Sequence, residues 1–203
     1  MADTADAGAR MALRHATAAA HERLHHLPDF AGLQAGTIGP DEYAGLLRRL
    51  FVFHRAVEAA LADAPSLLPY GIDIVARRRS GLLLEDLAFL GAPVAPLPVA
   101  PDLPTPRSAT EALGLMYVTE GSTLGGRDLA RRLEHLLPRD SDLGRRFLFG
   151  HGPRHGAMWR EFCAALEACG DTPQRRAEMI DAALAAFAAF GDWFGAAGVH
   201  AAG

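Results

Sequence analysis

The chain has 203 residues, half of them hydrophobic and 22% charged, and its formal net charge is −4. This length and composition are sufficient for one domain with a sizeable core. The modest negative charge does not favour nucleic acid or an anionic membrane surface as a partner. The sequence contains no lysine, so any anionic ligand would be bound by arginine, whose guanidinium group is a planar array of donors.

The first half of the chain is typical of three helices. Residues 8–28 are expected to form the first helix, which ends near Pro28 and is followed by a loop over 29–39. Pro40 suits the first turn of a second helix that runs to about residue 62, because proline is favoured at that position. A third helix is expected over 71–90.

The second half of the chain begins with a segment that cannot be helical. Residues 91–106 contain six prolines, and we interpret them as a stiff connector within one domain, although a linker between domains is the alternative. Further helices are expected over 107–137, 139–150 and 153–170, and a last one begins at Pro173. No strand alternation is evident. The sequence therefore predicts an all-α fold, as one domain over 1–203 with an ordered core of about 8–195.

The two cysteines and the N-terminus bear on the compartment. Cys163 and Cys169 would lie on opposite faces of one helix, too far apart for a disulfide. No apolar run resembles a signal peptide or approaches the ~20 residues of a membrane span. We therefore expect a cytoplasmic protein.

The first helix carries two polar residues at the edge of an apolar stripe. On a helical wheel, Arg14 and His21 share this edge and are separated by about 10 Å along the axis. An imidazole at the edge of a core, with a guanidinium two turns away, suits a large anionic ligand. A half-buried structural histidine is the plainer alternative. His21 and His25 also have the spacing of a metal-binding pair, but no third ligand is evident.

The segment "MYVTEGSTLGGR" (116–127) is unusual for a helix because it is rich in glycine. Gly114, Gly121 and Gly125 fall on one face, while Gly126 lies off this stripe and with Gly125 marks a bending point. Each glycine costs a helix roughly 1 kcal/mol relative to alanine. Two explanations remain open: another helix packs closely on the stripe, or a flat ligand lies against the exposed backbone.

Together the two helices suit a flat macrocycle held between an imidazole and a glycine face. Haem with one protein ligand and an open position on its other side is such a molecule.

Three segments resemble the haem oxygenase family. "LRHATAAAHERL" (13–24) is similar to the proximal-helix motif of these enzymes, and "LMYVTEGSTLGG" (115–126) to the distal-helix motif of the bacterial members. Residues 172–194 resemble the last helix of the family, and the bacteriophytochrome-associated enzymes look closest. The resemblance implies a single-domain fold in which haem is sandwiched between a proximal helix and a kinked distal helix.

The resemblance also implies an activity. Haem b would be both cofactor and substrate, and would be cleaved with O2 to biliverdin, CO and ferrous iron. A ferredoxin or a flavin reductase is expected to supply the electrons, and a bacteriophytochrome is a candidate recipient of the biliverdin.

The motifs assign expected roles to individual residues. His21 matches the axial ligand of the iron, and Arg14 matches a basic residue that pairs with a haem propionate. Arg160 is the candidate for the second propionate. The expected cofactor contacts are His21, Arg14, Tyr117, Val118, Gly121, Gly125, Gly126 and Arg160.

The expected catalytic residues are Gly121, Ser122 and Gly125 on the distal helix. Ser122 stands where animal members of the family have an aspartate that anchors a water network. The resemblance therefore implies that this chain builds the network differently, with backbone groups at the bend, Tyr117 and Ser122 as candidates.

The run Arg77–Arg79 is interpreted as a solvated helix face that, with Arg127, Arg131 and Arg132, could dock an acidic electron donor. Two alternatives to the enzyme remain open at this point. One is a haem sensor or carrier with the same fold, and the other is an unrelated all-α enzyme or helical interaction module in which His21 is structural.

Overall fold

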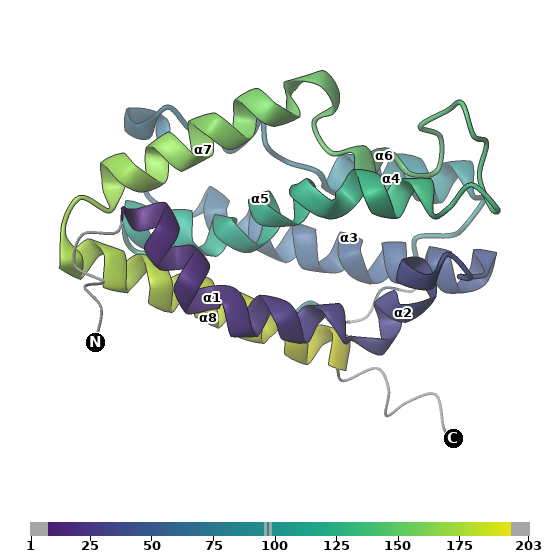
Figure 1. Ribbon diagram of the computed structural model, residues 1–203, viewed down its shortest axis with the longest axis horizontal. Helices are drawn as coiled ribbons and strands as arrows, with labels where there is room; N and C mark the ends of the chain where they lie inside the picture. Colours follow the sequence, from purple (N-terminus) through teal and green to yellow (C-terminus); the bar gives the residue numbers. More distant parts are fainter. Residues whose placement is uncertain (1–7, 96, 98, 196–203) are drawn as a thin grey trace.

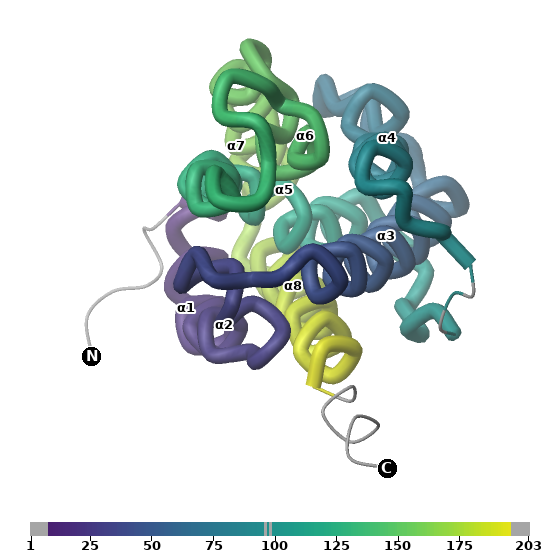
Figure 2. Tube along the Cα trace, turned by 90° about the vertical axis from the view of Figure 1, so that its right-hand side faces the viewer, coloured from purple at the N-terminus to yellow at the C-terminus, as the bar shows by residue number. Residues whose placement is uncertain are grey.

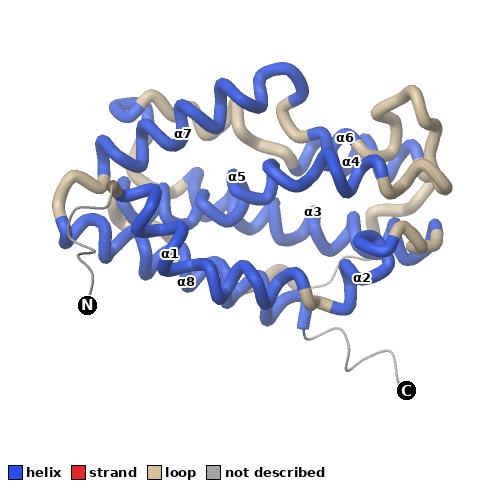
Figure 3. Tube along the Cα trace, viewed as in Figure 1, coloured by secondary structure: helices blue, strands red, loops and turns tan. Residues whose placement is uncertain are grey.

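The computed structural model describes residues 8–95, 97 and 99–195, and these residues form helices and loops with no strand (Figure 3). The α-helices are α1 (Ala9–His25), α2 (Pro28–Ala35), α3 (Pro40–Ala62), α4 (Ser80–Phe89), α5 (Ala109–Arg131), α6 (Arg146–Phe149), α7 (His155–Cys169) and α8 (Pro173–Gly195). Short 3-10 helices lie at η1 (Leu68–Tyr70) and η2 (Gly152–Arg154). The all-α prediction is thus confirmed.

The long helices form a bundle around α5. This helix packs most extensively on α8, and α8 in turn packs on α1, so that the first and last helices run side by side (Figure 1). Seen along the bundle, α1 and α2 lie at one side and α4 at the other, with α3 and α8 between them (Figure 2). No described helix is both long enough and apolar enough to cross a membrane.

Several helix starts follow directly from the sequence. At α3 the side chain of Glu42 accepts a hydrogen bond from the backbone N–H of Gly39 at 3.0 Å. At α5 the hydroxyl of Ser108 accepts one from the N–H of Glu111 at 3.1 Å. The free N–H groups at a helix start need such partners. The predicted starts of both helices are therefore confirmed to within a few residues.

The start of α1 is capped by another helix. Glu167 of α7 accepts hydrogen bonds from the backbone N–H groups of Ala9 and Arg10, at 2.7 and 3.1 Å. This contact fixes the N-terminal end of α1 against α7.

The predictions for the region around Pro28 were wrong in two respects. α1 ends at His25, and Pro28 begins α2 within a segment that the sequence analysis interpreted as a loop. Proline fits this position because its missing N–H would have no partner in a first turn. Gly36 ends α2 with a left-handed backbone (φ 71°), which glycine adopts without strain.

The predicted helix over 71–90 exists only in its second half, as α4. Residues 71–79 form turns, in which the carboxylate of Asp73 accepts hydrogen bonds from the N–H groups of Val75 and Ala76. Arg77 and Arg79 are buried and only Arg78 is exposed, so the interpretation of this run as a solvated helix face was wrong.

The predicted helices over 107–137 and 139–150 are shorter than expected. α5 ends at Arg131, and α6 spans only Arg146–Phe149. The buried guanidinium of Arg145 donates hydrogen bonds to four backbone carbonyls between these helices, including that of Ala130 at the end of α5. A side chain that satisfies these carbonyls stabilises an irregular connection in place of a longer helix.

The expectations for the last two helices, the proline-rich segment and the cysteines agree with the structure. α7 and α8 lie close to the predicted ranges, and the described residues of the proline-rich segment 91–106 are not helical. Both cysteines are free thiols.

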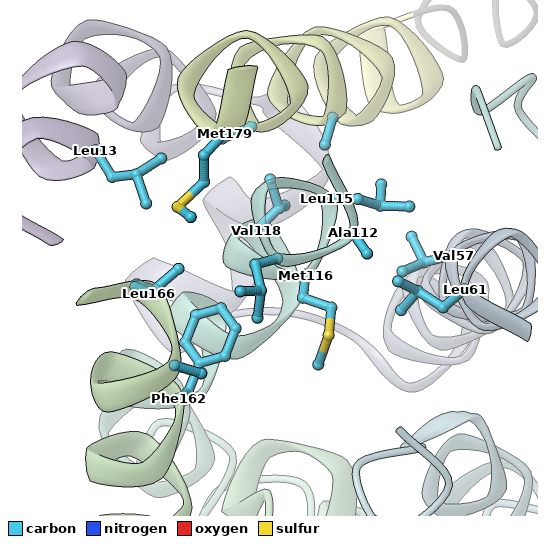
Figure 4. Packing of buried hydrophobic residues seen from close by; sticks show 14 of the residues in the cluster. Leu13, Val57, Leu61, Ala112, Leu115, Met116, Val118, Phe162, Leu166 and Met179 are labelled. Carbon is cyan, nitrogen blue, oxygen red and sulfur yellow. The ribbon is translucent and has the colours of Figure 1, made fainter. Parts of the chain in front are cut away.

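The core lies on both sides of α5. Val118 and Met116 of this helix lie between Phe162 of α7 on one side and Leu61 of α3 on the other (Figure 4). A second apolar cluster joins α2, α3, α4 and α6. Phe190 of α8 packs against both clusters, so α8 holds the two halves of the bundle together.

Candidate functional site

A cavity of about 730 Å³ opens within the bundle. Its walls are formed by α1 and α5, and α2, α3, α6, α7, α8 and the loop before α4 also contribute. About half of the lining residues are apolar, and the polar ones include three arginines and three histidines. A volume of this size is sufficient for a cofactor.

The α1 wall presents the imidazole of His21. Thr17 lies one turn before His21 and also lines the cavity. Its hydroxyl donates a hydrogen bond to the carbonyl of Leu13 at 2.7 Å, so its hydrogen is already used within the helix. The ring of His21 lies 6.2 Å from that of Phe187 and 4.7 Å from that of His25, measured between centroids. Burial, and secondarily His25, lowers the pKa of His21, which favours the neutral imidazole that binds metals.

Arg14 also lines the cavity on the α1 wall, as the wheel predicts. Arg10 lines it one helical turn earlier, and the sequence analysis missed this residue. Arg10 could have been predicted from its i, i+4 spacing to Arg14, which places both arginines on the same face of the helix. Arg160 does not line the cavity and is exposed on α7, where its neighbour Trp159 contributes to the wall instead.

The glycines of α5 divide into two groups. A Cβ atom added at Gly121 or Gly125 would meet nothing within 4 Å, and both residues line the cavity. A Cβ at Gly114 would lie 2.3 Å from the carbonyl oxygen of Met179 on α8. The explanation by close helix packing therefore holds at Gly114. Gly121 and Gly125 leave the helix wall bare towards the cavity, and a flat ligand against this wall stays a prediction.

Gly126 has a packing role. A Cβ at this position would lie 2.2 Å from the carbonyl oxygen of Leu148, so only glycine allows α6 to approach α5 this closely. α5 remains helical through Gly126 to Arg131. The bend expected at Gly125 and Gly126 stays a prediction.

Ser122 is part of a small polar network next to the glycine wall. Its hydroxyl donates to the carbonyl of Thr119 at 2.8 Å and accepts a hydrogen bond from Nη2 of Arg79 at 2.9 Å. Nη2 of Arg79 also donates to the carbonyl of Thr119, at 2.6 Å. The serine therefore holds a guanidinium group at the cavity. Tyr117 and Val118 also line the cavity.

Arg79 is a buried cation at the lining of the cavity, with only 4% of its surface exposed. Its guanidinium lies 4.6 Å above the ring of Phe147. Burial lowers its pKa to about 10, against the opposing effects of Glu120 and Glu58, so it remains charged at neutral pH. The sequence analysis missed this residue because it interpreted the arginine run as exposed.

His54 is a second buried group that the sequence analysis missed. It lies on α3, its ring is 4.9 Å from that of Phe147, and it lines the cavity. Burial, with a smaller effect from Arg79, holds the pKa of His54 well below its usual value. His54 also lines a smaller adjoining cavity of about 20 Å³, together with Glu58 and Glu120. The signal in the sequence was a histidine within the apolar run "LFVFHRAV".

The arrangement fits a flat, mostly apolar ring that carries carboxylates and a metal. A neutral imidazole lies on one wall, and the other wall is a helix whose glycines leave the space beside the backbone free. Two arginines on the α1 wall can pair with carboxylates, and the buried cation Arg79 and the buried imidazole of His54 also line the cavity.

Comparisons with known proteins agree with this geometry. A family model described as heme oxygenase matches residues 8–196. The chain is 38% identical to the heme oxygenase of Xanthomonas campestris pv. campestris (strain 8004) over 160 residues, which are 78% of this chain and 92% of that relative.

The fold is also similar to solved structures. The NO- and CO-bound heme oxygenase of Neisseria meningitidis superimposes with a TM-score of 0.73 at 28% identity, covering 93% of this chain and 92% of that one. The heme oxygenase of Leptospira interrogans gives 0.74 at 18% identity, covering 93% and 98%. The heme complex of the cyanobacterial enzyme from Synechocystis gives 0.69 at 18%, covering 94% and 92%. At 18% identity, the last two show the fold alone.

Proposed function

The chain belongs to the haem oxygenase family and is an enzyme that degrades haem, and we propose that it binds haem b between α1 and α5, as both cofactor and substrate. The observation that carries this proposal is the placement of His21 and the bare glycines Gly121 and Gly125 in one cavity. Bound haem supplies the iron that activates O2 and the ring that is opened to biliverdin.

His21 is the proposed axial ligand. Burial lowers its pKa, which favours the neutral imidazole that would hold the iron. Gly121 and Gly125 would keep the α5 side of the cavity clear of side chains, where a gas could bind.

Arg10 and Arg14 are the proposed partners of the two propionates. Both line the cavity from α1, and guanidinium groups bind carboxylates in a bidentate manner. Such a clamp fixes the rotation of the ring in its plane, and hence which edge faces the polar network of α5. We propose Arg10 for the second propionate in place of Arg160, which does not line the cavity.

Arg79, Ser122 and His54 are the proposed polar groups of the distal side. The described bonds of Arg79 use Nη2, so Nε and Nη1 can donate to a water or a ligand next to the glycine wall. Its lowered pKa keeps the imidazole of His54 neutral, so one ring nitrogen can accept a hydrogen bond while the other donates one. Ser122 would act by fixing the position of Arg79, because its own hydrogen is directed at the carbonyl of Thr119.

The partners beyond haem and O2 are also proposals. We propose a ferredoxin or a flavin reductase as the electron donor, a cytoplasmic location, and a bacteriophytochrome as one recipient of biliverdin. With Arg77 and Arg79 buried, a basic docking surface would consist of Arg127, Arg131 and Arg132 on and just beyond α5, which are exposed.

The decisive experiment is aerobic turnover of the haem-loaded protein with a chemical reductant. Loss of the Soret band and formation of one biliverdin isomer are expected from the wild type. Replacing Arg10 or Arg14 with glutamine should yield a mixture of isomers, because the ring is then free to rotate. Arg23→Gln is the matched control, since Arg23 is an exposed arginine of α1 outside the cavity lining. An unchanged isomer pattern in both cavity variants would contradict the clamp.

A further inference from the structure

The neighbour of the proposed axial ligand has no role in the function proposed above. His25 follows His21 by one helical turn on α1, and both side chains line the large cavity. Their ring centroids are 4.7 Å apart, with the planes at 72°. We propose that in the haem-free protein His21 and His25 together bind a divalent transition-metal ion.

The geometry of the pair is suited to chelation. Residues four apart lie on the same face of a helix, and this is the spacing by which helical histidine pairs bind zinc. Two imidazoles at this separation can turn one nitrogen each towards a shared ion. Imidazole is a good ligand for zinc, copper, nickel and iron. The carboxylate of Glu22 also borders the cavity and adds a negative charge next to the pair.

The other histidines of the helix are not arranged in this way. His26 lies outside the cavity lining, is exposed and is paired with Glu22, with its Nε2 3.4 Å from the carboxylate. His15 is exposed on another part of α1 and does not line the cavity.

The pair His151 and His155 has the same spacing, but its surroundings disfavour a cation. His151 lies before α7 in a turn, and its pKa is lowered to about 4 by burial and by Arg79, Arg77 and Arg154. The positive charges that oppose a proton there also oppose a metal ion. His21 and His25 are therefore the pair that the structure favours.

A site of two imidazoles is open and exchangeable. Among the described residues no group of three or more histidine, cysteine, aspartate or glutamate side chains is placed to hold a metal, so water completes the coordination. His21 cannot serve both ligands, so the metal and haem exclude one another. If haem is degraded in this cavity as proposed, its ferrous iron is released next to the pair, and this ion is the natural occupant. Only the identity of the occupant rests on the proposed function.

The test is a metal titration of the haem-free full-length protein. Zn²⁺ and Co²⁺ are added separately, with binding followed by calorimetry and by the visible spectrum of Co²⁺. We expect one ion per chain, and about tenfold or greater loss of affinity in both His21→Ala and His25→Ala. His26→Ala is the matched control and should retain the affinity of the wild type. Equal affinity in wild type and His25→Ala, or an equal loss in His26→Ala, would overturn the proposal.

A competition experiment tests the shared use of His21. Zn²⁺ bound beforehand should slow or weaken formation of the Soret band in the wild type. In His25→Ala the band should still form, because His21 is intact, and Zn²⁺ should no longer affect it. Inhibition by Zn²⁺ that persists in His25→Ala would contradict the shared site. Anaerobic Fe²⁺ that displaces Co²⁺ from the wild type supports iron as the occupant. The titration needs no turnover, so it can fail or succeed independently of the proposed enzymatic mechanism.

Discussion

At the residue scale, Ser122 shows how a short side chain can act through a longer one. It sits on α5 beside the glycine wall and binds the guanidinium of Arg79 at 2.9 Å. Arg79 is 43 residues earlier in the chain and reaches the cavity from a turn. The helical wheel placed His21 and Arg14 at the cavity because both belong to one helix. It did not place Arg79, because the arginine run was interpreted as a solvated helix face and its partner Ser122 lies in another segment.

His21→Ala should abolish biliverdin formation, because it removes the only proposed protein ligand of the iron. Added imidazole should restore part of the activity by entering the space that the side chain leaves. Turnover and the absorption spectrum of the haem complex, with and without imidazole, provide the measurement. Full activity of the variant without imidazole would rule out His21 as the ligand.

Arg79→Gln should lower turnover more than Ser122→Ala does. The arginine is the charged hydrogen-bond donor next to the glycine wall, and loss of one positioned hydrogen-bond donor costs about 10²-fold or more. The serine hydrogen is already directed at the carbonyl of Thr119, so its removal should have a smaller effect. The rate constant for biliverdin formation at saturating reductant measures both variants. A larger loss in Ser122→Ala would show that the hydroxyl acts directly.

At the element scale, local signals predicted helices well where a cap or a proline marked the start. Pro40 predicted the start of α3, and the structure shows that the side chain of Ser108 caps α5 close to its expected start. The errors occurred where tertiary contacts override local preference. Residues 71–79 have helical composition, but Arg77 pairs with the buried Glu120 at 2.7 Å and cannot do so from a solvated helix. Such a contact is invisible in one sequence because its two partners are far apart.

The glycines of α5 allow packing and function to be separated by experiment. Gly125→Ala should stabilise the haem-free protein by up to about 1 kcal/mol, because its Cβ enters open space and alanine favours helix. Gly114→Ala should destabilise it, because its Cβ would collide with the carbonyl of Met179. Urea unfolding of the two variants measures the difference. If Gly114→Ala were the more stable variant, the assignment of Gly114 to helix packing and of Gly125 to the open cavity wall would be contradicted.

A larger side chain at the same site should block the reaction. Gly125→Leu should fold and retain some haem affinity, but its side chain would fill the space beside the glycine wall, and biliverdin formation should be lost. Haem titration and turnover together check this, with an exposed helix position such as Ala188→Leu as the control. Unimpaired turnover in Gly125→Leu would show that the ring does not lie against this wall.

At the scale of the whole molecule, the cavity depends on contacts made by residues outside its lining, such as Asp86. The carboxylate of Asp86 on α4 accepts hydrogen bonds from the N–H groups of Arg146 and Phe147, at 2.8 and 2.9 Å. It thereby fixes α6, whose Phe147 packs against Arg79 and His54. A change in Asp86 should therefore affect both global stability and the shape of the distal side.

The ionisation of Asp86 makes this coupling measurable through pH. Burial raises its pKa to about 6, from 3.8, in spite of the two backbone hydrogen bonds. The folded state thus holds the proton more tightly than the unfolded state does. The resulting stabilisation is complete below about pH 4 and is lost as the pH rises through about 6.

Asp86→Asn removes this titration and serves as the reference. The amide keeps one acceptor oxygen but directs its NH2 group at a backbone N–H, so the variant should be less stable at every pH. The difference in free energy of unfolding between wild type and variant should shrink between about pH 4 and 6, by at most ~3 kcal/mol, and stay constant above pH 7. Urea unfolding across this range, with the exposed Asp102→Asn as control, provides the measurement. A difference that grows with pH would mean that the backbone hydrogen bonds, and not burial, dominate the ionisation of Asp86.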